Sequence, residues 1–153
     1  RVIGRTILPT QHVVILNRGS TSHVAADFVL VDLAGIAGRV LEATPTASTG
    51  LLLTDPNSRI ACLVERSRES ALLVGTGGRL CQLQYLDVDA DVEVDDRIVT
   101  AGLGGPFPKG LPLGVVVKVD RDARNARMRA WVRPAVRIHQ LEEVLCLPPS
   151  KGE

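Results

Sequence analysis

Short apolar runs rich in β-branched residues follow one another along almost the entire chain, and this succession constrains the fold more than any other feature. Residues 12–17, 59–66 and 113–122 are examples, and Gly, Pro, Asn, Asp or Ser separates most of the runs. Helical periodicity is nearly absent, and its one candidate, residues 138–145, is short. Many short strands at regular spacing are typical of a β-sandwich or barrel. We therefore predict an all-β fold.

The chain also contains an internal echo. Residues 24–31 resemble residues 92–99 at an offset of 68 (92 − 24), and residues 38–43 resemble residues 114–119 at an offset of 76 (114 − 38). Because the offsets differ by eight residues (76 − 68), the second copy carries an eight-residue insertion in the loop between its two strands. Two similar β units predict two β lobes packed together.

Composition limits the classes of function. Apolar residues make up 45% of the 153 residues and aromatic residues only 3%, so aliphatic side chains must fill the core. The formal net charge of +1 argues against a general binder of nucleic acid, which usually has a strongly basic domain. No apolar run approaches the roughly 18 residues of a membrane helix. The chain opens on Arg1 and a strand-like run, without a secretory signal pattern, and is interpreted as a piece of a longer protein.

The stretch TAGLGGPFPKGLPLG, residues 100–114, resembles a phosphate-binding loop only superficially. A P-loop needs its lysine after the last glycine and a helix behind it. Here Lys109 precedes Gly110, Pro112 lacks an amide proton, and a strand-like run follows. We interpret the stretch as a wide, stiff hairpin loop with Phe107 as an apolar contact residue, and residues 75–78 as a second hairpin turn. The glycines expected to supply positive φ are Gly102, Gly104, Gly105 and Gly110.

Catalytic and metal-binding patterns are weak. The histidines are His12, His23 and His139, and no serine lies in a G-x-S-x-G elbow. Since triads are defined by geometry, a serine-protease-like two-barrel enzyme stays open as the alternative function. The spacing of the cysteines lacks the close pairs of a zinc site, and their odd number forbids full internal pairing. We assign no catalytic, cofactor-binding or metal residue and no cofactor, and expect buried free thiols at Cys62, Cys81 and Cys146.

Residues 127–133, in the second half of the chain, form a basic stripe. Strand alternation over residues 127–133 points Met128, Ala130 and Val132 to one face. Three interpretations stay open for the other face: a solvated surface with arginines paired to acids such as Asp120 or Asp122, a protein interface, or a nucleic-acid surface. The candidate partner-binding residues are Phe107 and Lys109 of the loop and Arg127, Arg129, Trp131 and Arg133 of the stripe.

Three further positions are read as structural turns. His23, Asp27 and Asp95 lie in turn sequences, and Asp27 and Asp95 occupy equivalent places in the two copies of the echo. Asp and His are among the non-glycine residues that tolerate left-handed backbone geometry. We expect turn roles for all three.

Several motifs of the chain together resemble those of one protein family. The run LLLTDPNSRIACLVERS, residues 51–67, resembles the LLTDPNS-x-I-x-V-x-V-x-R signature of the MreC family of bacterial rod shape-determining proteins. Further matches follow in the order of the family, and together they extend from about residue 1 to residue 147. They are residues 16–20, 35–40, 98–105, 107–114 and 141–145.

The resemblance implies a fold and a location. It implies two small six-stranded β-barrel-like lobes packed together, like chymotrypsin-like barrels but without an active site. We expect the first lobe over residues 1–66, the second over residues 67–136, and a C-terminal strand and tail over residues 137–153. A membrane helix and a coiled coil would precede this domain, anchoring it to the inner membrane with the β domain in the periplasm. The family usually has glycine where this chain has His23, Asp27 and Asp95. Because His and Asp can still adopt positive φ, we expect those turns to survive with modest strain.

The resemblance also implies a function. Family members are not enzymes but scaffolds of the cell-elongation machinery. They bind the elongation-specific penicillin-binding transpeptidase, help to activate peptidoglycan synthesis, work with MreD, RodA and MreB, and self-associate as dimers or filaments. The expected partners are therefore proteins, with no nucleic acid, and with the membrane contacted only through the missing helix.

Overall fold

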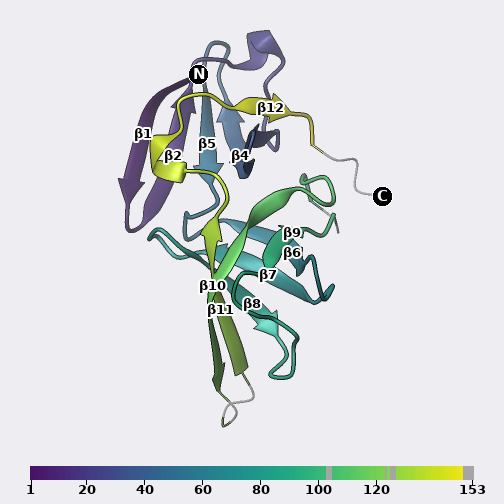
Figure 1. Cartoon of the computed structure of the whole chain (residues 1–153). Helices are drawn as coiled ribbons and strands as arrows, with labels where there is room; N and C mark the ends of the chain where they lie inside the picture. Colours follow the sequence, from purple (N-terminus) through teal and green to yellow (C-terminus); the bar gives the residue numbers. More distant parts are fainter. Residues whose placement is uncertain (103–104, 123, 125–126, 150–153) are drawn as a thin grey trace.

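The computed structural model describes residues 1–102, 105–122, 124 and 127–149. Strands dominate it, and short 3-10 turns such as η1 (Ser20–Ser22) and η3 (Ile138–Gln140) lie between them. The prediction of an all-β fold is confirmed. Figure 1 shows two lobes, one above the other, with the hairpin of β10 and β11 extending beyond the lower lobe.

The upper lobe is a six-stranded antiparallel sheet in the order β1-β2-β5-β4-β3-β12. Its edges are β1 and β12, so the sheet itself is open, and a backbone hydrogen bond of 2.8 Å from Val2 to Glu142 ties β1 to the segment that leads into β12. The strands are β1 (Val2–Leu8), β2 (Gln11–Leu16), β3 (Val29–Asp32), β4 (Gly35–Ala43), β5 (Ser48–Leu52) and β12 (Leu145–Leu147).

The lower lobe is a closed six-stranded barrel in the order β10-β11-β8-β7-β6-β9. One lobe is therefore a closed barrel and the other an open six-stranded sheet, and a likeness to chymotrypsin-like barrels stays a prediction. The strands of the barrel are β6 (Arg59–Val64), β7 (Ser70–Gly75), β8 (Cys81–Leu86), β9 (Arg97–Thr100), β10 (Pro112–Asp122) and β11 (Arg127–Pro134).

The change of lobe comes earlier in the chain than the expected boundary at residue 66. Strand β6 pairs with β7 and β9 of the barrel, so the barrel begins at Arg59. The physical reason is the alternation in β6, which turns Ile60, Cys62 and Val64 into the barrel interior. The chain returns to the upper sheet at its other end, because β12 pairs with β3.

The internal echo corresponds to a repeated structure. The amide of Asp27 donates to the carbonyl of Val40 at 2.8 Å, and the amide of Asp95 donates to the carbonyl of Val116 at the same distance. Val31 pairs with Ile36 across a loop of four residues (32–35), whereas Val99 pairs with Pro112 across twelve (100–111). The difference is the predicted insertion of eight residues. The two copies therefore build the same strand–loop–strand unit, one in each lobe.

An aliphatic core joins the two lobes. Val14, Leu30 and Ile36 of the upper sheet belong to the same buried cluster as Leu83 and Val132 of the barrel. Valine, leucine, isoleucine and alanine make up most of it, as the low aromatic content requires. Because apolar burial is continuous across the junction, the lobes stabilise each other.

Candidate functional site

Strand β11 carries the predicted basic stripe. Met128, Ala130 and Val132 are buried in the barrel, and Trp131 on the opposite face is half-buried. The alternation arises because β11 closes the barrel between β10 and β8, which leaves only one of its faces to solvent. The exposed arginines of the stripe are Arg127, Arg129 and Arg133.

Trp131 has a cationic neighbour that the sequence did not identify. The Nζ atom of Lys118 lies 4.9 Å from the centroid of the Trp131 ring, at the distance of a cation–π contact. The two residues are directly opposite each other in β10 and β11. Lys118 is identified only by the pairing register of β10 and β11, which spacing along the chain does not predict.

The acids suggested as partners of the arginines are their cross-strand neighbours. Asp120 is opposite Arg129, and Asp122 is opposite Arg127. However, the ion pairs found within 4 Å in the described part of the chain are centred on Arg39 and Arg66. The guanidinium of Arg129 has no ion pair with any described residue, so it is available to a partner.

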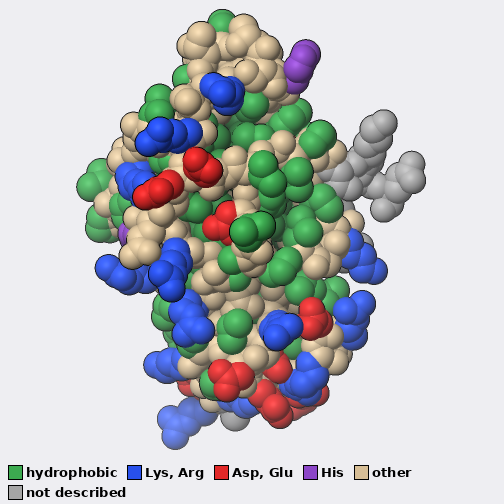
Figure 2. Space-filling model, turned by 45° about the horizontal axis from the view of Figure 1, so that its top comes forward, with side chains coloured by type: hydrophobic (Ala, Val, Ile, Leu, Met, Phe, Trp, Pro, Cys, Tyr) green, Lys and Arg blue, Asp and Glu red, His purple; other side chains and the backbone are tan. Residues whose placement is uncertain are grey.

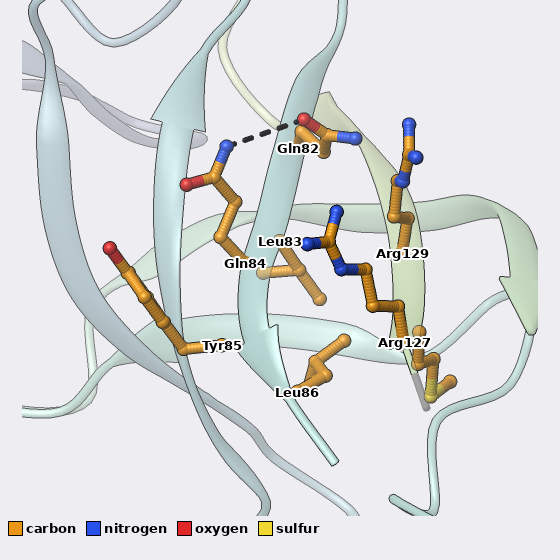
Figure 3. Close-up of a pocket in the computed structure, with 8 residues that line it drawn as sticks. Gln82, Leu83, Gln84, Tyr85, Leu86, Arg127 and Arg129 are labelled. Carbon is orange, nitrogen blue, oxygen red and sulfur yellow. Dashed lines mark hydrogen bonds between the residues drawn. The ribbon is translucent and has the colours of Figure 1, made fainter. Parts of the chain in front are cut away.

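A groove of about 550 Å³ lies beside the stripe, between β8 and β11. Its polar lining is formed by Gln82, Gln84, Arg127 and Arg129, with Leu83, Leu86 and Met128 as apolar lining. Figure 3 shows the two arginine side chains extending to the same side as Gln82, whose Oε1 accepts a hydrogen bond from Gln84 Nε2 at 3.5 Å. The groove therefore presents guanidinium and amide donors together.

Tyr85 at the edge of this groove is the most unusual residue of the barrel surface. Its φ is 62°, in the left-handed region that a tyrosine rarely adopts, and the residue is 81% exposed. A register shift between the pairs Met128–Leu86 and Ala130–Leu83 marks a β-bulge at this point. Simple alternation from Cys81 and Leu83 would have pointed Tyr85 into the barrel, and the bulge instead turns it outward.

The long loop between β9 and β10 is held by Thr100. The Thr100 amide donates to the Leu111 carbonyl at 3.0 Å, and the Leu111 amide donates to the Thr100 hydroxyl at 2.9 Å. The Gly110 amide donates to the Thr100 carbonyl at 2.9 Å. Phe107 is half-buried and packs against the chain's own core, whereas Lys109 is exposed. The loop follows β9 at one end of β11, and Arg127 lies at the other end, so the candidate residues do not form one compact patch.

The residues assigned to turns have left-handed backbones. The φ angles are 65° at His23, 69° at Asp27 and 76° at Asp95. Asp27 also accepts a hydrogen bond from Arg39 Nη1 at 3.3 Å. Gly102, Gly105 and Gly110 have positive φ as well, and Gly104 lies outside the described residues.

A buried polar joint between the lobes gives a structural role to Thr54 and Asp55, the first two residues of the TDPNS part of the signature. His12 of β2 is 1% exposed, and its Nδ1 and Nε2 lie 2.6 Å from Thr54 Oγ1 and 3.0 Å from the Gly77 carbonyl. Its backbone amide donates to the Asp55 carboxylate at 2.7 Å. Both ring nitrogens are therefore engaged away from solvent, and the imidazole is not placed to activate a nucleophile.

The cysteines behave as core residues to different degrees. Cys62 and Cys81 are buried in the barrel, and burial raises the pKa of each thiol to about 12. Cys146 in β12 is half-buried, and burial raises its pKa as well. All three are free thiols. In the described ranges no three His, Cys, Asp or Glu side chains are grouped to hold a metal ion.

These features define a class of protein: a two-lobed all-β domain whose exposed arginines and half-buried tryptophan suit contact with another macromolecule. The chain belongs to the MreC family, because the model of that family, "Rod shape-determining protein MreC, barrel core", matches residues 2–148.

Relatives and solved structures agree with this assignment. Over 77% of its own length, the chain is 34% identical to the cell shape-determining protein MreC of Caulobacter vibrioides. Over 96% of its own length, it is 30% identical to the cell shape-determining protein MreC of Escherichia coli. These matches span only 34% and 40% of the two relatives. The crystal structure of MreC from Pseudomonas aeruginosa, 29% identical, superimposes with a TM-score of 0.91 over 95% of each chain. Within the described ranges no helix has the length and apolarity to cross a membrane.

Proposed function

We propose that this domain is a non-catalytic scaffold of the bacterial cell-elongation machinery. It binds the elongation-specific penicillin-binding transpeptidase, helps to activate it, and so maintains rod shape. The observation that carries the proposal is the family match over residues 2–148. A solved complex of penicillin-binding protein PBP2 with MreC from Helicobacter pylori supports the choice of partner, and that MreC shares the fold with this chain at 18% identity and a TM-score of 0.58.

The surface proposed for this contact is the stripe of β11 with its adjoining groove. Arg129 and Trp131 are its centre, because one is free of ion pairs with described residues and the other is a large, half-buried aromatic side chain. Arginine and tryptophan are enriched among the residues that dominate binding energy. Tyr85 adds an exposed aromatic ring on the same side of the barrel. Phe107 and Lys109 form a separate, secondary contact at the loop.

The remaining assignments follow from membership of the family. We infer anchoring to the inner membrane, with this domain in the periplasm, self-association, and work in one complex with MreD, RodA and MreB. Membrane tethering confines the domain and its partners to one layer and raises their effective concentration. Contacts that are weak in solution therefore suffice for binding at the membrane.

A serine-protease-like enzyme is the alternative, and the environment of His12 weighs against it. Both ring nitrogens are bonded, to Thr54 and Gly77, and the side chain is buried. A fluorophosphonate probe separates the two functions. We expect no labelled serine, and a serine whose labelling disappears in His12→Ala would contradict the proposal.

Co-purification with the ectodomain of the elongation transpeptidase tests the scaffold directly. We expect this domain to be retained by the immobilised ectodomain, and retention to fall when Arg129→Glu and Trp131→Ala are combined. If the double variant is retained as well as the unaltered domain, the stripe is not the binding surface. If the unaltered domain is not retained, the proposed scaffold function is contradicted.

A further inference from the structure

A second groove, of about 510 Å³, lies where the barrel meets the upper sheet. One wall is the end of β11 with the following segment, residues 133–140, and the other is Arg79 and Leu80 of the β7–β8 turn. Figure 2 shows Lys and Arg side chains gathered in a row along one side of the molecule, on the left in that view. The groove is distinct from the one between β8 and β11, because the two share no lining residue.

The charge of this groove is one-sided. Arg79, Arg133 and Arg137 line it, and no acidic residue does. All three side chains are exposed, and their guanidinium groups make no hydrogen bond or ion pair with any described residue. Arg5, by contrast, is used internally, because its Nη1 donates to the His139 carbonyl at 2.6 Å.

Acidic residues occur next to the groove but not in it. Arg137 also lines a neighbouring depression with Asp32, Glu142 and Glu143, and none of these acids comes within 4 Å of its guanidinium as an ion pair. For a chain with a net charge of +1, three guanidiniums without an acid are a local concentration of positive charge. Such a concentration favours an anionic ligand.

The chemistry of the walls narrows the ligand. A guanidinium is planar and matches the two oxygens of a carboxylate or a phosphate. The groove also has an apolar floor, in which Leu80 and Pro134 are half-buried and Val136 and Ile138 are buried. A polyphosphate has no apolar groups to cover such a floor, whereas a peptide with alternating acidic and apolar side chains satisfies both. A near-neutral chain also argues against a nucleic acid.

We propose that this junction groove, defined by Arg79, Arg133 and Arg137 with their apolar floor, binds an acidic segment of a protein partner. The segment carries Glu or Asp side chains that pair with the arginines and apolar side chains that cover the half-buried Leu80 and Pro134. This site does not depend on the transpeptidase proposal, since the stripe variants of that test leave Arg79 and Arg137 unchanged.

His139 supplies an internal reporter of occupancy. It lines the groove, its buried Nε2 has no hydrogen-bond partner among the described residues, and its ring lies edge-on to that of His12 with centroids 6.0 Å apart. Burial lowers the pKa of His139, and the charges of Arg79, His12 and Arg5 lower it further. A bound carboxylate would offset Arg79, so the pKa of His139 should rise when the groove is filled.

The test uses a fluorescein-labelled octapeptide, Glu-Leu-Glu-Pro-Glu-Val-Glu-Leu, and a matched peptide with Gln at every Glu. Binding is followed by fluorescence anisotropy in about 50 mM salt, where charge interactions are weakly screened. We expect the Glu peptide to bind at least about tenfold more tightly than the Gln peptide. We also expect it to raise the pKa of His139 in an NMR titration.

Two charge-matched variants decide the location. Arg79→Gln with Arg137→Gln should weaken binding by about tenfold or more, while Arg59→Gln with Arg97→Gln, exposed positions of the barrel outside the groove, should change it by less than about twofold. Thermal melts of both variants establish that they fold. Equal binding of the two peptides, equal effects of the two variants, or displacement by tripolyphosphate at the same concentration as by unlabelled peptide would overturn the proposal.

Discussion

Arg66 and Asp96 form a two-armed ion pair that fixes the wall of the barrel. Nε and Nη2 of Arg66 donate to Oδ1 and Oδ2 of Asp96 at 2.8 and 2.9 Å, and Asp96 is buried. The same guanidinium donates to both carboxylate oxygens of Asp91, at 2.9 and 2.8 Å. Arg66 is the last residue of the signature that begins LLTDPNS. Its role in this chain is to hold the segment before β9 against the end of β6.

Removing this guanidinium should destabilise the barrel. In Arg66→Ala the buried carboxylate of Asp96 loses its partner, which is more costly than losing an exposed ion pair. We expect the thermal midpoint to fall by several degrees, and Arg66→Lys to recover only part of the loss because an ammonium cannot make the same fork. Arg59→Ala, which changes an exposed arginine of strand β6, is the control. Equal midpoints for Arg66→Ala and this control would contradict the assigned role.

The glycines at equivalent places in the two lobes should not tolerate alanine. A Cβ on Gly38 would lie 1.9 Å from the Leu51 carbonyl oxygen, and one on Gly114 would lie 2.3 Å from that of Arg133. Since backbone must move in both cases, we expect each Gly→Ala change to cost about 1–3 kcal/mol or more in the free energy of unfolding. Gly78→Ala, whose Cβ would meet only Thr76 Oγ1 at 3.5 Å, is the matched control for chemical denaturation.

The junction between the lobes should weaken in mild acid. Burial, the largest cause, and the charges of Arg79, His12 and Arg5 lower the pKa of His139, so the unfolded chain binds a proton before the folded chain does. Stability contributed by neutral His139 is complete above its unfolded pKa of about 6.5 and is lost as the pH falls toward the lower folded pKa. His139→Asn should flatten this part of the profile. A profile identical to that of the unaltered domain would refute the role of His139.

A second, more acidic transition has a different cause. Hydrogen bonds from Arg66 lower the pKa of Asp96 and of Asp91. Their stabilising effect is present above the ordinary aspartate pKa of about 3.9 and disappears as the pH falls through the lower folded values. Arg66→Ala should remove this transition and leave that of His139 in place. Denaturant melts across the pH range measure both.

The thiols should differ in reactivity by burial. Cys62 and Cys81 have their pKa raised to about 12, so neither has a useful thiolate fraction at neutral pH. We expect a disulfide reagent to modify them only after unfolding, while half-buried Cys146 reacts first in the folded domain. Cys146→Ser should remove the fast reaction. Persistence of that reaction would show that a barrel thiol is accessible.

Most of the fold could be predicted from local patterns in the sequence. Alternation in residues 127–133 gave the correct faces of β11, and the echo gave the shared strand–loop–strand unit, because both depend on backbone geometry over a few residues. The lobe boundary and the return of β12 to β3 depend on which distant strands pair, and spacing along the chain does not encode that. Tyr85 was missed because a single bulge reverses the face on which a side chain lies. Arg79 and Arg137 come together because β8 pairs with β11, a long-range contact that spacing along the chain does not encode.

The central claim is that the stripe of β11 binds the elongation transpeptidase. Titration of the purified transpeptidase ectodomain with this domain measures it most directly, comparing the unaltered chain with Arg129→Glu combined with Trp131→Ala, and with the control Arg59→Glu. We expect saturable binding that the double variant weakens by at least about tenfold and the control leaves within about twofold. Binding that is absent for the unaltered domain, or equal for all three proteins, would contradict it.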